Sequence, residues 1–183
     1  MRGILTRLLF LISIFFSISI PGNVGAEDFE APPKGFRAIE LGMDLERVKE
    51  LLSGDSYFLY RGDPDVSMLE KPNRTLIECK GSFFIHRAFF QFYEEKLYII
   101  ILMLNQEQLD HYSLFTTLSE RYGKPQHFSP QRISWSSGEV ELSLERPLTV
   151  KYLDLVVFEE LKMKSRAEES LMQGLRENFL KQF

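Results

Sequence analysis

The sequence predicts an α+β fold in which two helix-plus-strands units build one antiparallel sheet. The helices are expected on one face of that sheet, with an extra helix at the C-terminus. Three observations lead to this prediction. An amphipathic helical pattern is followed by strand-like segments, the same order then recurs, and the end of the chain is charged and favours helix. The units cover about 35–105 and 106–157, as two weak repeats within one domain, 35–157.

The N-terminus has the three parts of a secretory signal peptide. Two arginines precede an apolar run, Leu8–Ile20, and a small-x-small cleavage site ends at Ala26. A membrane span takes roughly 20 apolar residues, and a Pro-Gly pair cuts this run short. Residues 1–26 are therefore expected to be cleaved, leaving residues 27–34 as a polar lead-in.

The expected compartment follows from this leader and from the position of the only cysteine. Cys79 is far from the cleavage site, so the cysteine that would accept a lipid at a new N-terminus is missing. A single cysteine also cannot form an internal disulfide. We expect an exported protein of the periplasm or cell envelope that is soluble after signal cleavage and is not a lipoprotein.

The first unit is expected to open with a short helix. Leu45, Val48 and Leu52 recur at helical spacing, with Asp44 as the expected N-cap and Gly54 as the expected end. Strands are expected to follow at 57–60, 75–79, 85–93 and 97–104. The last of them has no polar face, so we expect a central strand covered on both sides.

The second unit repeats this order. A helix is expected at 110–122, ended by Gly123, and turn residues separate three further short segments of strand character. These strands are expected at 132–136, 139–145 and 148–153. Residues 158–183 are expected to form an amphipathic helix that packs on the exposed sheet face or binds a partner.

Two short stretches resemble a known group of exported domains. Ile39–Leu52 resembles the GM-x-x-x-x-V-x-x-x-L opening of the BamE/SmpA family and of β-lactamase-inhibitor-like proteins, and Leu118–Pro125 is similar to the L-x-x-x-x-G-x-P helix ending of the same group. The resemblance implies tandem helix-strand-strand units and a non-catalytic envelope domain that acts through protein contacts. The chain departs from BamE-type lipoproteins in lacking the lipid-accepting cysteine.

Side chains that could carry catalysis are sparse. His86, His111 and His127 are scattered and lack the spacing of a zinc site. Asp110 beside His111 is expected to cap a helix, because no nucleophile elbow accompanies the pair. Cys79 is expected to be a small buried hydrophobic residue. We expect no enzyme, no cofactor and no metal site.

The charge balance and the surplus of apolar residues bear on partners. With 22 basic and 26 acidic residues the chain is acidic, so nucleic acid is not an expected partner. We expect a non-catalytic accessory subunit or inhibitor-like binder that contacts another envelope protein, with peripheral membrane association and oligomeric state left open. The candidate interaction surface comprises Phe89, Tyr93, Leu171, Leu175 and Phe179.

A carrier of an apolar ligand such as a lipid, enclosed by the sheet and the C-terminal helix, is the alternative. An interior cavity favours the carrier, and a flat exposed patch favours the protein partner. Arg61-Gly62-Asp63 matches an integrin-binding tripeptide, but turn chemistry explains the same residues.

Overall fold

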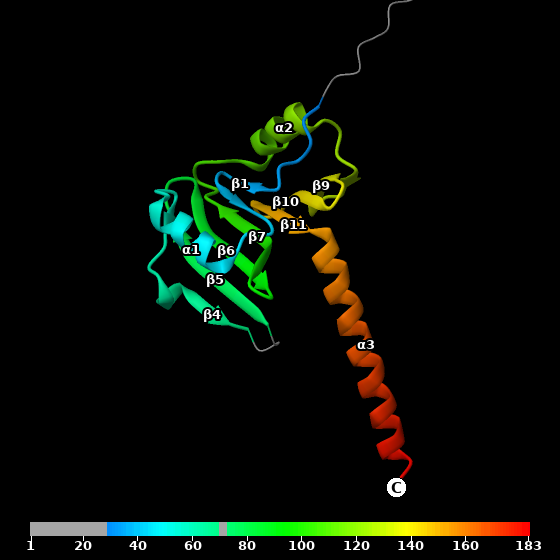
Figure 1. Cartoon of the computed structure of the whole chain (residues 1–183). Helices are drawn as coiled ribbons and strands as arrows, with labels where there is room; N and C mark the ends of the chain where they lie inside the picture. Colours follow the sequence, from blue (N-terminus) through cyan, green and yellow to red (C-terminus); the bar gives the residue numbers. More distant parts are fainter. Residues whose placement is uncertain (1–28, 70–72) are drawn as a thin grey trace, which may run out of the picture.

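The computed structural model describes residues 29–69 and 73–183 (Figure 1). The expected signal peptide, residues 1–26, lies outside the described residues. Within them, nine strands form one antiparallel sheet in the order β3-β5-β6-β7-β11-β10-β9-β8, with β4 also pairing with β5. The strands are β3 (Phe58–Leu59), β4 (Val66–Met68), β5 (Arg74–Gly81), β6 (Ile85–Tyr93), β7 (Lys96–Leu104), β8 (His127–Phe128), β9 (Arg132–Ser137), β10 (Val140–Glu145) and β11 (Thr149–Asp154).

A separate two-stranded hairpin precedes the first helix and lies over the large sheet (Figure 1). Its strands are β1 (Gly35–Phe36) and β2 (Ile39–Glu40). The helices are α1 (Leu45–Gly54), α2 (His111–Tyr122) and α3 (Leu155–Leu180), and a short 3-10 turn, η1 (Asp63–Asp65), precedes β4.

The predicted fold class was wrong. The described chain is mostly antiparallel β-sheet with three helices, and it does not consist of two helix-plus-strands units. Two short strands precede α1, five strands follow it and four follow α2, so the two parts are not equivalent. The predicted repeat depends on the order of the elements that the sequence reveals. β1, β2, β4 and β8 are too short to show a period-2 pattern, so they are missing from that order.

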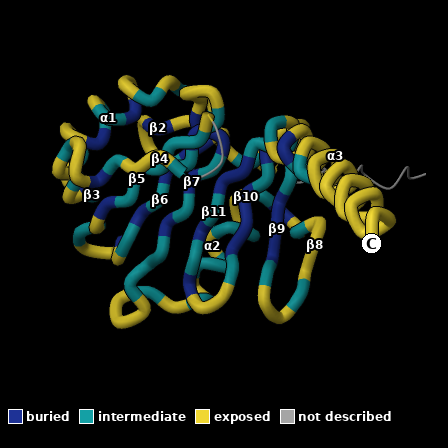
Figure 2. Tube along the Cα trace, turned by 90° about the horizontal axis from the view of Figure 1, so that it is seen from below, coloured by how far each residue is buried: buried dark blue, intermediate teal, exposed yellow. Residues whose placement is uncertain are grey.

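One face of the large sheet carries the hydrophobic core. Ile77, Phe90 and Ile100 form a cross-strand row on that face, and all three are fully buried. β7 lies in the middle of the sheet, as expected, but the described residues cover only one of its faces. Ile99 and Ile101 point to the other face and are half-buried, because α1, α2 and the β1–β2 hairpin all lie over the core face (Figures 1 and 2).

The first helix packs on the core as its spacing predicts. Val48 and Leu52 of α1 are buried beside Ile39 of the hairpin. The expected N-cap contact is absent at this described helix end: the Asp44 side chain makes no capping hydrogen bond. Its carboxylate instead pairs with the Lys96 ammonium at 2.6 Å, which ties the start of α1 to the β6–β7 turn.

The second helix begins and ends with standard caps. The Asp110 carboxylate accepts a hydrogen bond from the Ser113 backbone N–H at 2.9 Å, and Gly123 ends the helix with a φ of 75°. The carbonyl of Gly123 accepts a hydrogen bond from the buried Trp135 indole at 2.9 Å, and the Phe29 ring packs directly on Gly123. Glycine is required there by both its φ and its neighbours.

The third helix starts on the sheet and then leaves it. The Asp154 carboxylate caps α3 by accepting hydrogen bonds from the backbone N–H groups of Val156 and Val157, both at 3.0 Å. Leu161 is the buried residue of this helix, 7% exposed. Residues 166–183 are all exposed, and α3 projects away from the sheet (Figures 1 and 2).

Candidate functional site

The face of the large sheet opposite the core is an apolar surface bordered by charges. Residues that are paired across adjacent strands point to the same face of the sheet. The register of β5, β6 and β7 therefore places the apolar side chains of this face next to one another. Each of these side chains is half-buried, as expected for a sheet face shielded only by neighbouring side chains. We call this surface the open face; its apolar centre comprises Leu76, Phe89, Ile99, Ile101 and Met103.

Ion pairs lie on both sides of this apolar centre. On the β5–β6 side, Arg87 pairs with Glu78 at 2.8 Å. On the β9–β11 side, Glu145 accepts from Lys151 at 2.6 Å and lies 3.4 Å from Arg132, which also pairs with Glu141. Burial raises the pKa of Glu145, but its hydrogen bonds to Lys151 and Ser143 and the nearby Arg132 lower it more, so the net pKa is below the ordinary value. This carboxylate is therefore ionised at neutral pH.

The open face adjoins α3 close to where that helix leaves the sheet. The Lys164 ammonium donates to the Tyr93 hydroxyl at 2.7 Å and lies 5.1 Å from the centre of that ring, which joins α3 to the end of β6. Phe179 follows Leu161 by 18 positions, which at 3.6 residues per turn is five full turns. Phe179 therefore points to the same side of α3 as the residue that contacts the sheet.

The sequence-predicted interaction residues fall on these two adjoining surfaces. Phe89 and Tyr93 lie on the open face, half-buried. Three exposed residues at a spacing of four form one side of α3, which we call the α3 stripe. The α3 stripe comprises Leu171, Leu175 and Phe179, at 64%, 54% and 58% exposure.

The strand at 97–104 is part of the apolar surplus of the sequence, but the predicted interaction residues do not include those that β7 contributes to the apolar centre. Ile99, Ile101 and Met103 belong to a strand without a polar face, which predicts burial on both sides. The neighbouring strand β6 carries a signal for this surface, because Phe89 and Tyr93 alternate with its core residues and therefore lie on the face opposite the core.

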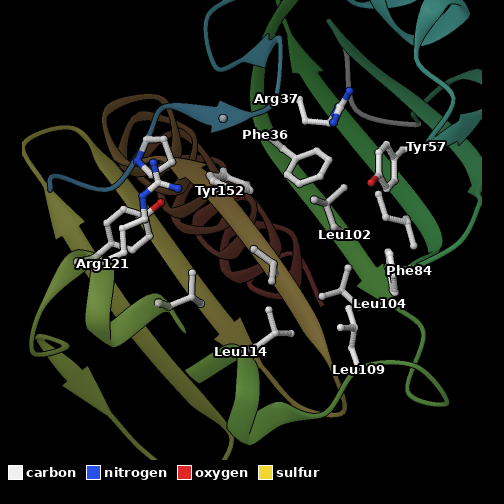
Figure 3. Close-up of a pocket in the computed structure, with 16 residues that line it drawn as sticks. Phe36, Arg37, Tyr57, Phe84, Leu102, Leu104, Leu109, Leu114, Arg121 and Tyr152 are labelled. Carbon is white, nitrogen blue, oxygen red and sulfur yellow. The ribbon is translucent and has the colours of Figure 1, made fainter. Parts of the chain in front are cut away.

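A second feature is an apolar pocket of about 610 Å³ on the core side of the sheet (Figure 3). Its floor contains the cross-strand pair Leu102 and Val150 together with Tyr152. Phe36 of the hairpin forms one wall, and α2 forms another. The rest of the apolar lining is Pro33, Phe84, Ile85, Leu104, Leu109, Leu114 and Leu118, and Arg37, Arg121, Tyr57 and Tyr122 supply polar groups.

The remaining chemistry-bearing side chains have structural surroundings. Cys79 is buried in β5, and burial raises the pKa of its thiol to about 12, so the thiol is protonated and a poor nucleophile at neutral pH. In the part of the chain that the structure describes, no three His, Cys, Asp or Glu side chains gather as metal ligands would. The Arg61 side chain is tied to the buried Asp65 carboxylate at 2.8 Å, so the Arg-Gly-Asp sequence is part of a hydrogen-bonded turn.

Comparisons with known proteins give one match. The model of a protein family, the TP0088 domain, matches residues 34–164. No curated protein and no solved structure matches the chain. In residues 29–69 and 73–183, no helix combines the length and apolar character that crossing a bilayer takes.

Proposed function

The chain belongs to the TP0088 domain family, and we propose that it is a non-catalytic protein of the periplasm or cell envelope that acts by binding another protein. The open face and the α3 stripe form the binding surface. The partner is an envelope protein that carries a complementary apolar patch surrounded by charged groups.

The observation that carries this proposal is the anatomy of the open face. An apolar centre lies between the Arg87–Glu78 pair and the charges around Glu145. Protein interfaces have the same arrangement, with an apolar core that loses water on binding and a polar rim that stays partly hydrated. A partner that covers Phe89, Ile101 and Met103 would gain the hydrophobic free energy that the isolated chain leaves unused.

The exposed part of α3 supports a protein partner more than a lipid surface. Helices that bind at a membrane surface carry an excess of Lys and Arg, which attracts anionic lipids. Residues 166–183 instead carry balanced charges, with Arg166, Arg176 and Lys181 against Glu168, Glu169 and Glu177. The stripe would therefore be drawn to an apolar groove of a protein, as in helix-in-groove recognition.

Export and the class of assembly are also part of the proposal. The signal-like pattern of residues 1–26 supports export to the periplasm or envelope. The resemblance of Ile39–Leu52 to the BamE/SmpA opening supports an accessory subunit of an envelope assembly. This support concerns the motif alone, since the chain does not fold into the predicted tandem units.

A capture experiment with matched variants tests the proposal. The tagged protein is purified from detergent-solubilised envelopes, and co-purifying proteins are identified by mass spectrometry. The variant L171S/L175S/F179S removes the α3 stripe, and Met163→Ser is the control, since Met163 is also an exposed apolar residue of α3 (62%) but lies off the stripe. Circular dichroism confirms that each variant is folded.

We expect one stoichiometric envelope protein that the Met163→Ser variant retains and the stripe variant loses. Recovery of the folded protein alone, or equal recovery of the partner with both variants, would contradict the proposal.

A further inference from the structure

The apolar pocket on the core side has the shape and lining of a small-molecule site. Its volume of about 610 Å³ lies within the range of roughly 300–1,000 Å³ typical of such sites. We propose that this pocket binds a single-chain amphiphile with an anionic head group, its chain over Leu102 and Leu104 and its head group at Arg121. This inference is independent of the protein-binding surface, which lies on the opposite face of the sheet.

The packing of α2 is the first argument. None of its residues is fully buried, although Leu114, Leu118 and Tyr122 point toward the core. Protein interiors are otherwise close-packed, so a helix whose apolar side chains stay half-buried leaves room between itself and the sheet. That room is the pocket, and these α2 side chains line it (Figure 3).

The apolar end of the pocket fits a hydrocarbon chain. Leu102 and Val150 are buried in the floor, and Leu104 and Leu109 continue the apolar lining toward Phe84 (Figure 3). These aliphatic side chains have no hydrogen-bonding groups, so they can make only apolar contacts with a ligand. The affinity of this end for a ligand should therefore depend on the length of its hydrocarbon chain.

The opposite end gathers polar groups from two elements. The Arg121 guanidinium lies 5.6 Å from the centre of the Tyr122 ring, and Tyr152 lies in the adjoining floor. Burial raises the pKa of both tyrosines, and the nearby Arg121 lowers each by a smaller amount. Both phenols stay protonated at neutral pH and can donate to an anion beside Arg121.

Arg121 is the better placed of the two arginines for a ligand. Arg37 donates to Asp55 at 2.8 Å, and the Asp55 side chain is only 13% exposed, so this pair is the more shielded of the two. Arg121 pairs through Nε with Glu30 at 2.6 Å, and both side chains of that pair are exposed. Exposed pairs are weak, so a carboxylate or phosphate can share this guanidinium with Glu30.

Calorimetric titration of the purified protein with decyl probes tests the proposal. Decanoate and monodecyl phosphate carry anionic head groups, decanol is neutral, and decyltrimethylammonium carries the opposite charge on the same chain. We expect both anions to bind more tightly than decanol, and the cation to bind most weakly. The ratio between the two anions then separates a fatty-acid ligand from a phosphate-bearing one.

Three variants locate the site. Arg121→Gln should weaken decanoate binding by about tenfold and leave decanol binding unchanged, because only the charge-assisted contact is lost. Leu114→Trp should weaken binding of every decyl probe, because the larger ring narrows the pocket. Arg47→Gln is the control, since Arg47 is an exposed arginine of α1 that also pairs with a glutamate, and it should bind like the unaltered protein.

Absence of decanoate binding up to its solubility limit, equal binding of the cation and the anions, or full binding by a folded Leu114→Trp variant would each overturn the proposal. A thermal melt of each variant confirms folding before titration.

Discussion

Replacement of Leu161 by alanine tests whether α3 is held to the sheet only through its first turns. Leu161 is 7% exposed and is the buried residue of α3. Burial of a leucine stabilises by about 1.5–3 kcal/mol, and alanine retains a small part of this. Because a surface helix can settle into the vacated space, we expect a cost near the middle of that range, about 2 kcal/mol.

That cost should detach α3 locally and leave the sheet intact. Helices in proteins gain most of their stability from packing of an apolar face, and residues 166–183 are all exposed. Gly174 in this exposed part costs a further ~1 kcal/mol relative to alanine. A loss of about 2 kcal/mol corresponds to roughly 30-fold faster hydrogen exchange at amides that open by local detachment. We expect this acceleration at residues 158–165, with β6 and β7 amides unchanged.

Leu175→Ala is the matched control. Leu175 is an exposed leucine of the same helix, and exposed substitutions usually change stability by less than about 0.5 kcal/mol. Equal acceleration by both variants, or acceleration in β6 and β7 as large as in α3, would refute the reasoning, because α3 would then be held along its whole length or unfold together with the sheet.

Three further predictions concern the core and its turns. Gly123→Ala should destabilise by about 1–3 kcal/mol in urea denaturation, since its φ is positive and a Cβ would lie 2.6 Å from the Phe29 ring; a neutral result would contradict the assigned turn. Asp65→Ala should cost about 1–3 kcal/mol, because it leaves the Arg61 backbone N–H without its carboxylate partner, and an unchanged midpoint would show that this turn contributes nothing. Iodoacetamide should leave Cys79 unmodified in the folded protein at pH 8. Rapid labelling of the native protein would count against burial of this thiol. The pKa of the thiol is about 9 in the unfolded chain and about 12 in the folded one. The unfolded state therefore ionises first, and stability should fall as the pH rises from about 9 to about 12.

The sequence predicted the long elements well because each carries a strong periodic pattern. The strand expected at 85–93 is β6, with the same bounds, and the helix expected at 110–122 is α2 within one residue. Helical spacing likewise located α1. The C-terminal helix begins three residues earlier than expected, because Asp154 caps it directly after β11.

The arrangement of these elements could not be predicted in the same way. The fold class failed because β1, β2, β4 and β8 are too short to show a pattern, yet they make the parts of the chain before and after α2 unequal. A uniformly apolar β7 does not reveal which of its faces is covered. The pocket is less visible still, since its lining comes from the hairpin, α2, β7 and β11, which lie far apart in the sequence.

Site-specific photocrosslinking in intact cells tests the protein-binding surface most directly. A photoreactive amino acid is placed at Ile101 in the centre of the open face, at Phe179 on the α3 stripe, and at Arg47 on the outer side of α1 as a control. We expect Ile101 and Phe179 to yield the same crosslinked envelope protein and Arg47 to yield none. No product at Ile101 and Phe179, or the same product at Arg47, would contradict binding through the open face and the α3 stripe.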